Sequence, residues 1–144
     1  MTTLPVSESS SLSIGQLGIG WAAALVTILV LDGLWLGVIA QDLYKREMGS
    51  LFAEQVRVLP AVVFYAIYPA ALVFLTIMSA PGGWSAAAVR GAVLGLAAYG
   101  AYDLTNMSIV KGWPIGISLI DWTWGVLISA AAAAAAYAAT WGRS

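Results

Sequence analysis

The segment Leu17–Ala40, LGIGWAAALVTILVLDGLWLGVIA, decides the class of fold. Its only ionisable side chain is Asp32, and its 24 residues form a helix long enough to cross a hydrocarbon layer roughly 30 Å thick. The whole chain of 144 residues has the same character, because 61% of its residues are hydrophobic and only 9% are charged. An ordinary soluble domain carries about 25% charged residues. The composition therefore predicts an integral membrane protein and excludes a soluble globular enzyme.

Three further apolar segments are long enough to span a bilayer: Leu59–Ser79, Trp84–Val110 and the stretch from Pro114 to about Trp141. Turns rich in Gly and Pro separate the last three segments, at residues 80–83 and 111–114. We therefore predict an all-α fold, an integral membrane four-helix bundle. Residues 1–16 are expected to form a disordered tail rich in Ser and Thr, residues 17–141 a single four-helix transmembrane domain, and residues 142–144 a C-terminal tail.

The basic residues predict the orientation of the four spans. The loop at residues 41–58 and the turn at 111–114 lie on one side of the membrane, and together they carry Lys45, Arg46, Arg57 and Lys111. By the positive-inside rule this side is the cytoplasm, so both termini are expected outside. Apolar residues recur at helical spacing in the loop at 41–58. This loop is expected to form either a short amphipathic helix on the membrane surface or an ordinary connecting helix.

The amino acids that the chain lacks limit its chemistry. Without Cys it cannot form a disulfide or use a thiolate, and without His it lacks the commonest transition-metal ligand and the usual general base. The net charge of -1 gives no electrostatic attraction for nucleic acid. We therefore expect no metal ion, no cofactor and no nucleic-acid partner, and we assign no catalytic residue. The expected partner is the lipid bilayer.

Three carboxylates inside the predicted spans carry most of the functional information. Asp32 lies about eight residues before the cytoplasmic end of the first span, Asp103 about seven before the end of the third, and Asp121 about eight after the start of the fourth. All three therefore lie roughly 10–13 Å below the cytoplasmic surface. Each costs up to about 3 kcal/mol on insertion unless it faces the interior of the protein and finds partners. We predict a shared polar pocket in the cytoplasmic half.

Aromatic and polar neighbours extend this predicted pocket. Two of the carboxylates are followed by a Trp three residues later, which places each ring on the helix face of its carboxylate. On the third span, Tyr and Asn side chains lie near the carboxylate at helical spacing and can donate hydrogen bonds to it. The residues predicted to line the solute- or ion-binding pocket are Asp32, Trp35, Tyr99, Tyr102, Asp103, Asn106, Asp121 and Trp124.

The charge balance of this pocket bears on its function. Arg90 is the only basic residue inside the predicted spans, and about three to four helical turns separate it from Asp103, too far for a direct pair. Three carboxylates without a nearby cation cannot all be ionised in a low dielectric. The pocket is therefore expected either to hold protons near neutral pH or to bind a cation. The alternative is that the aspartates only join helices by hydrogen bonds, contacts that average about 0.6 kcal/mol.

Four of the seven tryptophans lie near the ends of the predicted spans: Trp21, Trp84, Trp113 and Trp141. Tryptophan is enriched at both membrane–water interfaces, where its amphipathic ring lies at the level of the headgroups. These four residues are therefore expected to be interface anchors and not part of the pocket.

Several motifs resemble those of a known family. LDGLWLG at residues 31–37, followed by DLY at 42–44, resembles the first-helix signature of small bacterial four-helix inner-membrane proteins catalogued as a domain of unknown function (family 2177). YDLTN at 102–106, continuing to KGWP at 111–114, is similar to the central motif of that family, and Asp121 with Trp124-Gly125 is similar to its last motif. The resemblance covers residues from about 20 to 140. It implies a multi-pass protein of the bacterial inner membrane and supplies no activity.

Three functions remain open. The first is a proton- or cation-coupled transporter or permease of a small solute. Four helices are few for a complete pathway, so this function predicts a homodimer or a larger assembly. The second is an accessory or structural subunit of a larger membrane complex. The third is a membrane enzyme that modifies lipid with Asp103 and Asp121 as an acid–base pair. It ranks last because the sequence shows no evident nucleophile or phosphate-binding group.

Overall fold

The computed structural model describes residues 11–51, 55, 57–78 and 82–143. Within these residues the chain forms five α-helices and no β-strand. The helices are α1 (Ile14–Leu34), α2 (Gln41–Met48), α3 (Val58–Val73), α4 (Gly83–Ile109) and α5 (Ile115–Thr140). Two π-helical turns, Trp35–Ile39 and Phe74–Met78, extend α1 and α3, and short 3-10 turns occupy Gly49–Leu51 and Trp141–Arg143.

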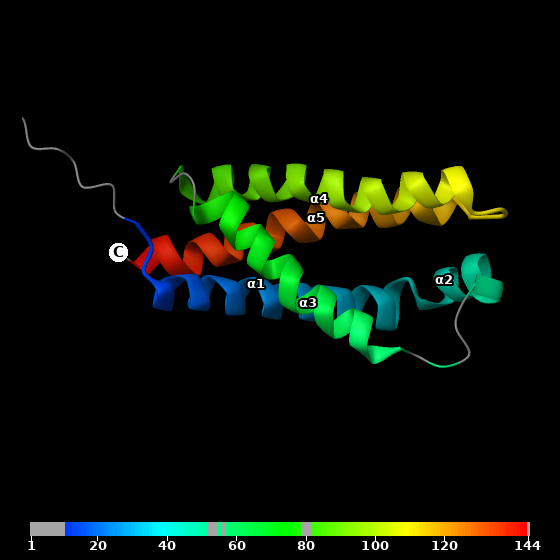
Figure 1. The fold of residues 1–144 in the computed structure, drawn as a ribbon, viewed down its shortest axis with the longest axis horizontal. Coiled ribbons are helices and arrows are strands. Elements are labelled where there is room, and N and C mark those ends of the chain that lie inside the picture. The colour runs from blue at the N-terminus through cyan, green and yellow to red at the C-terminus, as the bar shows by residue number, and fades with distance from the viewer. Residues whose placement is uncertain (1–10, 52–54, 56, 79–81, 144) are drawn as a thin grey trace, which may run out of the picture.

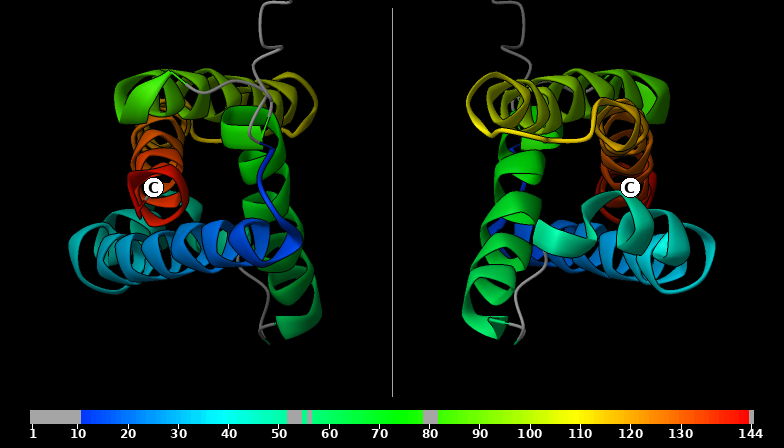
Figure 2. Two further views of the ribbon diagram at one scale, coloured as in Figure 1. Left: turned by 90° about the vertical axis from the view of Figure 1, so that its left-hand side faces the viewer. Right: turned by 90° about the vertical axis from the view of Figure 1, so that its right-hand side faces the viewer.

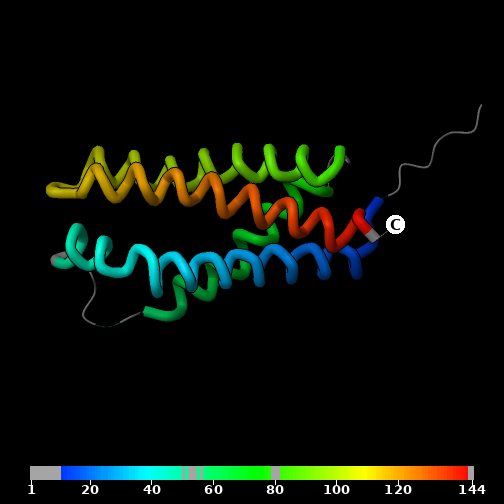
Figure 3. Tube along the Cα trace, turned by 180° about the vertical axis from the view of Figure 1, so that it is seen from behind, coloured from blue at the N-terminus to red at the C-terminus, as the bar shows by residue number. Residues whose placement is uncertain are grey.

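The four long helices surround a common axis, with α4 opposite α1 and α5 opposite α3 (Figure 2). α5 packs most extensively on α4 and next on α1, while α3 crosses the other helices obliquely (Figure 1). The start of α1 and the end of α5 lie at one end of the molecule. The short helix α2 and the turn that joins α4 to α5 lie at the other end (Figures 1 and 3). We call the latter the hairpin end.

The first helix begins earlier than the sequence suggests, because Ser13 caps it. The Ser13 hydroxyl accepts a hydrogen bond from the backbone N–H of Gln16 (3.3 Å), and the Gln16 side chain accepts one from the backbone N–H of Ser13 (2.9 Å). This reciprocal pair satisfies two donors that would otherwise be unpaired at the helix start. Residues 14–16, predicted to belong to a disordered tail, are therefore helical. Residues 1–10 lie outside the described part of the chain.

Among the described residues, three helices are long and apolar enough to cross a membrane: Ile14–Ile39, Val58–Met78 and Ile115–Thr140. They agree with the first, second and fourth predicted spans to within a few residues. The third predicted span is a helix too, with nearly the expected boundaries, but α4 is not among the three candidates. It carries Arg90 and Asp103, and it is rich in glycine and polar residues. A fourth membrane crossing therefore remains a prediction.

α4 and α5 approach each other closely because glycines line their interface. A Cβ atom added at Gly95 would lie 2.7 Å from the Ser129 hydroxyl and closer still to the backbone carbonyl of Gly125. Gly125 in turn receives the ring of Tyr99 against its backbone. Small residues of this kind let helix backbones approach closely in membrane proteins. This pairing fixes the relative position of the two helices that carry Asp103 and Asp121.

Candidate functional site

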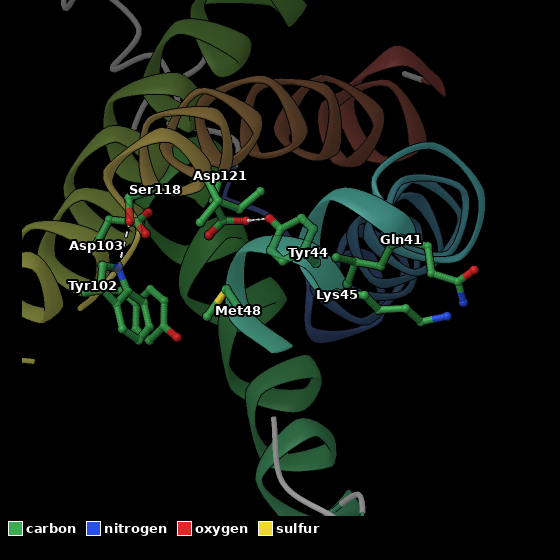
Figure 4. A pocket seen from close by; sticks show the side chains of 11 residues that line it. Gln41, Tyr44, Lys45, Met48, Tyr102, Asp103, Ser118 and Asp121 are labelled. Atoms are coloured by element: carbon green, nitrogen blue, oxygen red, sulfur yellow. Dashed lines mark hydrogen bonds between the residues drawn. The ribbon is translucent and has the colours of Figure 1, made fainter. Parts of the chain in front are cut away.

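A partly open cavity of about 470 Å³ lies at the hairpin end, lined by residues from the end of the α1 segment, α2, α4 and α5 (Figure 4). Figure 3 shows how this end is built: α2 folds back toward the turn between α4 and α5. The cavity is lined by Leu36, Gln41, Tyr44, Lys45, Met48, Tyr102, Asp103, Trp113, Ile117, Ser118 and Asp121. It therefore combines two carboxylates and two phenols with apolar and aromatic side chains.

Tyr44 connects α2 to the carboxylates of the cavity. The π-helical turn after α1 ends at Ala40, a buried residue whose backbone N–H donates to the carbonyl of Trp35 (2.7 Å). From there α2 runs across the hairpin end, and the Tyr44 hydroxyl donates a hydrogen bond to Asp121 of α5. Burial, and next the hydrogen bond to the negative charge of Asp121, raise the pKa of Tyr44 above that of an ordinary tyrosine. The phenol therefore stays protonated and remains a donor to the carboxylate.

Asp103 is a buried residue of the cavity lining, and its carboxylate lacks a full set of hydrogen-bond partners. Its side chain is only 2% exposed, and one of its two carboxylate oxygens has no hydrogen-bond partner within the described part of the chain. Native proteins seldom leave a buried polar atom unpaired, and such an atom calls for an explanation. Asp103 therefore lines the cavity with a carboxylate whose hydrogen bonding is incomplete.

The aromatic wall of the cavity is held in place by the turn between α4 and α5. Gly112 allows this tight turn because its φ of +76° lies in a backbone region that residues with a Cβ atom rarely adopt. The indole N–H of Trp113 donates to the Ser118 hydroxyl (2.7 Å), which donates in turn to the carbonyl of Pro114 (3.0 Å). The rings of Tyr102 and Trp113 meet edge to face, with centroids 5.7 Å apart. These contacts fix two aromatic rings beside the carboxylates.

The charge of the cavity lining is unbalanced at its carboxylate side. Within the described part of the chain, no Lys or Arg forms an ion pair with Asp103 or Asp121. Lys45 also lines the cavity, but its side chain is exposed and extends away from the two carboxylates, beside Gln41 (Figure 4). The carboxylate side is therefore suited to a positively charged ligand or to protons.

Asp32 does not line this cavity and has all its acceptor atoms engaged. One carboxylate oxygen accepts a hydrogen bond from the Tyr65 hydroxyl (3.0 Å) and the other from the indole N–H of Trp124 (2.9 Å). The ring of Trp124 stacks on that of Trp35, with centroids 4.6 Å apart and planes 9° apart. Asp32 thus joins α1 to α3 and α5, as a buried polar residue that stabilises helix packing does.

The eight residues predicted to form one pocket fall into several groups. Tyr102, Asp103 and Asp121 line the cavity, whereas Asp32, Trp35 and Trp124 form the separate cluster described above. The remaining two lie elsewhere: Tyr99 packs against Gly125 and the ring of Tyr68, and Asn106 donates to the backbone carbonyl of Tyr102 (3.0 Å). The carboxylates at one depth therefore divide into a cavity pair and a hydrogen-bonded structural residue.

Eight of the eleven residues that line the cavity were not predicted from the sequence, among them Tyr44, Trp113 and Ser118. Tyr44 belongs to a segment whose amphipathic pattern was visible, but the pattern does not say what its apolar face covers. Trp113, expected to be an interface anchor, is hydrogen-bonded to Ser118 on the cavity wall. The only sequence signal for this pair is the KGWP turn, which places Trp113 close to the first turn of the next helix.

No curated protein and no solved structure matches the chain. The family described as predicted membrane protein (DUF2177) matches residues 17–138. The match begins in α1 and ends in α5, so it includes every helix that lines the cavity. The chain therefore belongs to this family of predicted membrane proteins, DUF2177.

Proposed function

We propose that this protein is a small proton- or cation-coupled transporter or permease, and that its cavity binds the transported solute. The observation that carries the proposal is the buried carboxylate of Asp103, which has an unpaired oxygen and shares a cavity with Asp121. A structural aspartate is expected to have its acceptors engaged, as those of Asp32 are.

The free-energy cost of a buried, unpaired carboxylate supports a site that takes up and releases protons or cations. An ionised carboxylate without a partner in a low-dielectric site is unfavourable, and it is relieved either by a proton or by a bound cation. Asp103 and Asp121 line the same cavity, so a charge gained by one changes the field at the other. A site that alternates between protons and a positively charged solute therefore couples their movements.

The proposed orientation places the hairpin end in the cytoplasm. Lys45, Arg46 and Lys111 all belong to this end, and the positive-inside rule assigns such residues to the cytoplasmic side. All four long helices then cross the bacterial inner membrane, and both termini lie outside. Because four helices are few for a complete pathway, the functional unit is a homodimer or a larger assembly.

Reconstitution of the purified full-length chain into liposomes tests this function. Proton flux is followed with an entrapped pH-sensitive dye while cationic, zwitterionic and anionic solutes are added outside. We expect one solute class to drive proton movement, and we expect Asp103→Asn to abolish it. Asp42→Asn is the matched control, because Asp42 is an exposed carboxylate of α2 outside the cavity lining. A folded protein that moves neither protons nor any solute contradicts the proposal.

A second function, an accessory subunit of a larger membrane complex, is favoured by the Asp32 cluster. Its carboxylate holds helices together without any free acceptor, so at least one of the three aspartates has a structural role that needs no ligand. This function predicts that the protein co-purifies with a large membrane partner and that replacement of Asp103 or Asp121 by Asn has no effect on that complex.

A further inference from the structure

We infer that the cavity recognises an organic ammonium ion that carries at least one N–H donor and an apolar body. This inference rests on the proposed binding role of the cavity and specifies the class of solute. Three features of the cavity lead to it: the unpaired acceptor of Asp103, the aromatic corner formed by Tyr102 and Trp113, and the apolar side chains that complete the lining.

The need for an N–H donor follows from the hydrogen bonding of the carboxylates. Asp121 already accepts a hydrogen bond from Tyr44, whereas one oxygen of Asp103 has no partner within the described residues. A hydrogen-bond donor satisfies a carboxylate oxygen, and a charged N–H donor gives a shorter and stronger bond than a neutral one. A quaternary ammonium ion supplies the charge without the donor, so it leaves this oxygen unpaired.

The aromatic corner favours an ammonium ion for an independent reason. The Tyr102 and Trp113 rings line the cavity beside the carboxylates, and an aromatic face attracts a nearby cation, more strongly when the cation is desolvated. The Trp113 N–H is engaged by Ser118, so this indole presents its π surface and not a competing donor. A corner of this kind attracts an organic cation.

The remaining lining suits the apolar part of an organic solute better than the full oxygen shell of a hard metal ion. Calcium takes six to eight oxygen ligands and magnesium demands octahedral oxygen coordination. Among the described residues no group of three or more acidic side chains is placed to hold a metal ion, and the cavity itself contributes two carboxylates beside the apolar side chains of Leu36, Met48 and Ile117. A volume of about 470 Å³ lies in the range of about 300–1,000 Å³ typical of pockets that hold small organic molecules.

Calorimetric titration of the full-length protein in detergent micelles tests this inference. The probes are 2-phenylethylammonium, its N-trimethylated derivative, neutral 2-phenylethanol and magnesium chloride, each also titrated into protein-free micelles. We expect 2-phenylethylammonium to bind, and the trimethylated ion to bind about 10-fold or more weakly because it lacks the hydrogen bond to a charged acceptor. Asp103→Asn is expected to weaken binding of 2-phenylethylammonium by about 10- to 100-fold. Asp42→Asn is expected to leave the affinity for this ion unchanged.

A second variant covers the case in which Asp103→Asn does not fold. Tyr102→Leu changes a half-exposed residue of the aromatic corner and is expected to weaken binding of the ammonium ion by about 2- to 30-fold. Equal binding of the alcohol or the trimethylated ion, preferential binding of magnesium, or undiminished binding to folded Asp103→Asn overturns the inference. If Asp103→Asn is unfolded, undiminished binding of the ammonium ion to Tyr102→Leu overturns the inference.

The outcome for the ammonium ion can be separated from the outcome for transport. If liposomes show solute-driven proton flux and the protein does not bind 2-phenylethylammonium, the solute class is wrong and the transport function stands. If the protein binds the ammonium ion with the predicted dependence on Asp103 and no solute drives flux, the binding site stands and the transport function is wrong.

Discussion

The hydroxyl of Tyr44 donates a hydrogen bond to the carboxylate of Asp121, joining α2 to α5 between residues that are 77 positions apart in the chain. Among the described residues, this is the side-chain hydrogen bond that links α2 to the long helices. It places a neutral donor on one carboxylate of the cavity while the other, Asp103, keeps an unpaired oxygen. α2 is therefore both a wall of the cavity and a partner of its charged groups.

Loss of the Tyr44–Asp121 bond is expected to open the cavity. We predict that Tyr44→Phe increases the rate at which a thiol reagent labels Ser118→Cys by about 10-fold or more, because a hydrogen bond to a charged group contributes about 1.5–3 kcal/mol. Ser118 is 1% exposed and lines the cavity, and the natural chain has no cysteine to compete for the reagent. Labelling is followed by mass spectrometry of the purified protein.

The matched control for this labelling experiment is Ser108→Cys. Ser108 is exposed on α4 and does not line the cavity, so its labelling is expected to be equally fast with Tyr44 or Phe at position 44. Equal labelling of Ser118→Cys in the two backgrounds would show that α2 does not close the cavity.

Replacement of Asp32 separates its hydrogen bonds from its charge. We expect Asp32→Leu to lower the free energy of unfolding by about 1–3 kcal/mol, because it leaves the partly buried donors of Tyr65 and Trp124 unpaired. Asp32→Asn is expected to retain most of the stability, since its amide oxygen accepts from Trp124 and its amide nitrogen donates to the Tyr65 oxygen. Thermal unfolding in detergent compares the two. A stable Asp32→Leu protein contradicts the structural role.

Replacement of Asp103 is expected to have the opposite effect on stability. Its carboxylate is buried with an unpaired oxygen, so Asp103→Leu removes an unfavourable group and raises the free energy of unfolding by about 1–3 kcal/mol. A gain in stability with a loss of solute binding is typical of residues retained for function. The same unfolding assay, performed without solute, gives the comparison. A large destabilisation would assign Asp103 a structural role instead.

The close approach of α4 and α5 predicts a strong effect of a single methyl group. Gly95→Ala is expected to cost about 1–3 kcal/mol of unfolding free energy, because its Cβ would collide with Ser129 and with the backbone of Gly125. Gly18→Ala is the control, since nothing lies within 4 Å of a Cβ at that helical position. It is expected to be neutral or to stabilise the helix by up to about 1 kcal/mol. If both variants unfold alike, the helix interface differs from that described.

The long helices could be predicted from sequence because apolar length and turn residues mark them directly. The segment predicted as Leu59–Ser79 is helical over Val58–Met78, and that predicted as Trp84–Val110 is helical over Gly83–Ile109. The main error lies at the first helix, where the Ser13 cap starts the helix at Ile14, three residues before the predicted Leu17. Apolar length alone does not mark this start, which the capping pair Ser13 and Gln16 sets.

The candidate site could be predicted only in part. The position of a residue along a helix gives its depth in the membrane, but it does not give the neighbouring helix that the residue faces. One residue corresponds to about 100° around the helix axis, so residues at one depth can face different neighbours. Asp103 and Asp121 line one cavity, whereas Asp32 faces Tyr65 and Trp124. The sequence pattern contained no information on the packing of α2, and for this reason Tyr44 was not predicted.

The central claim is that Asp103 and Asp121 form one coupled binding site and that Asp32 is a separate structural group. Infrared difference spectroscopy of the carboxyl bands, recorded as the pH of the purified protein is changed, tests this claim most directly. We predict that the titration assigned to Asp103 changes in Asp121→Asn and is unaltered in Asp42→Asn. If the carboxyl groups titrate independently and the variants remain folded, the aspartates serve only to pack the helices, and the account of the site is wrong.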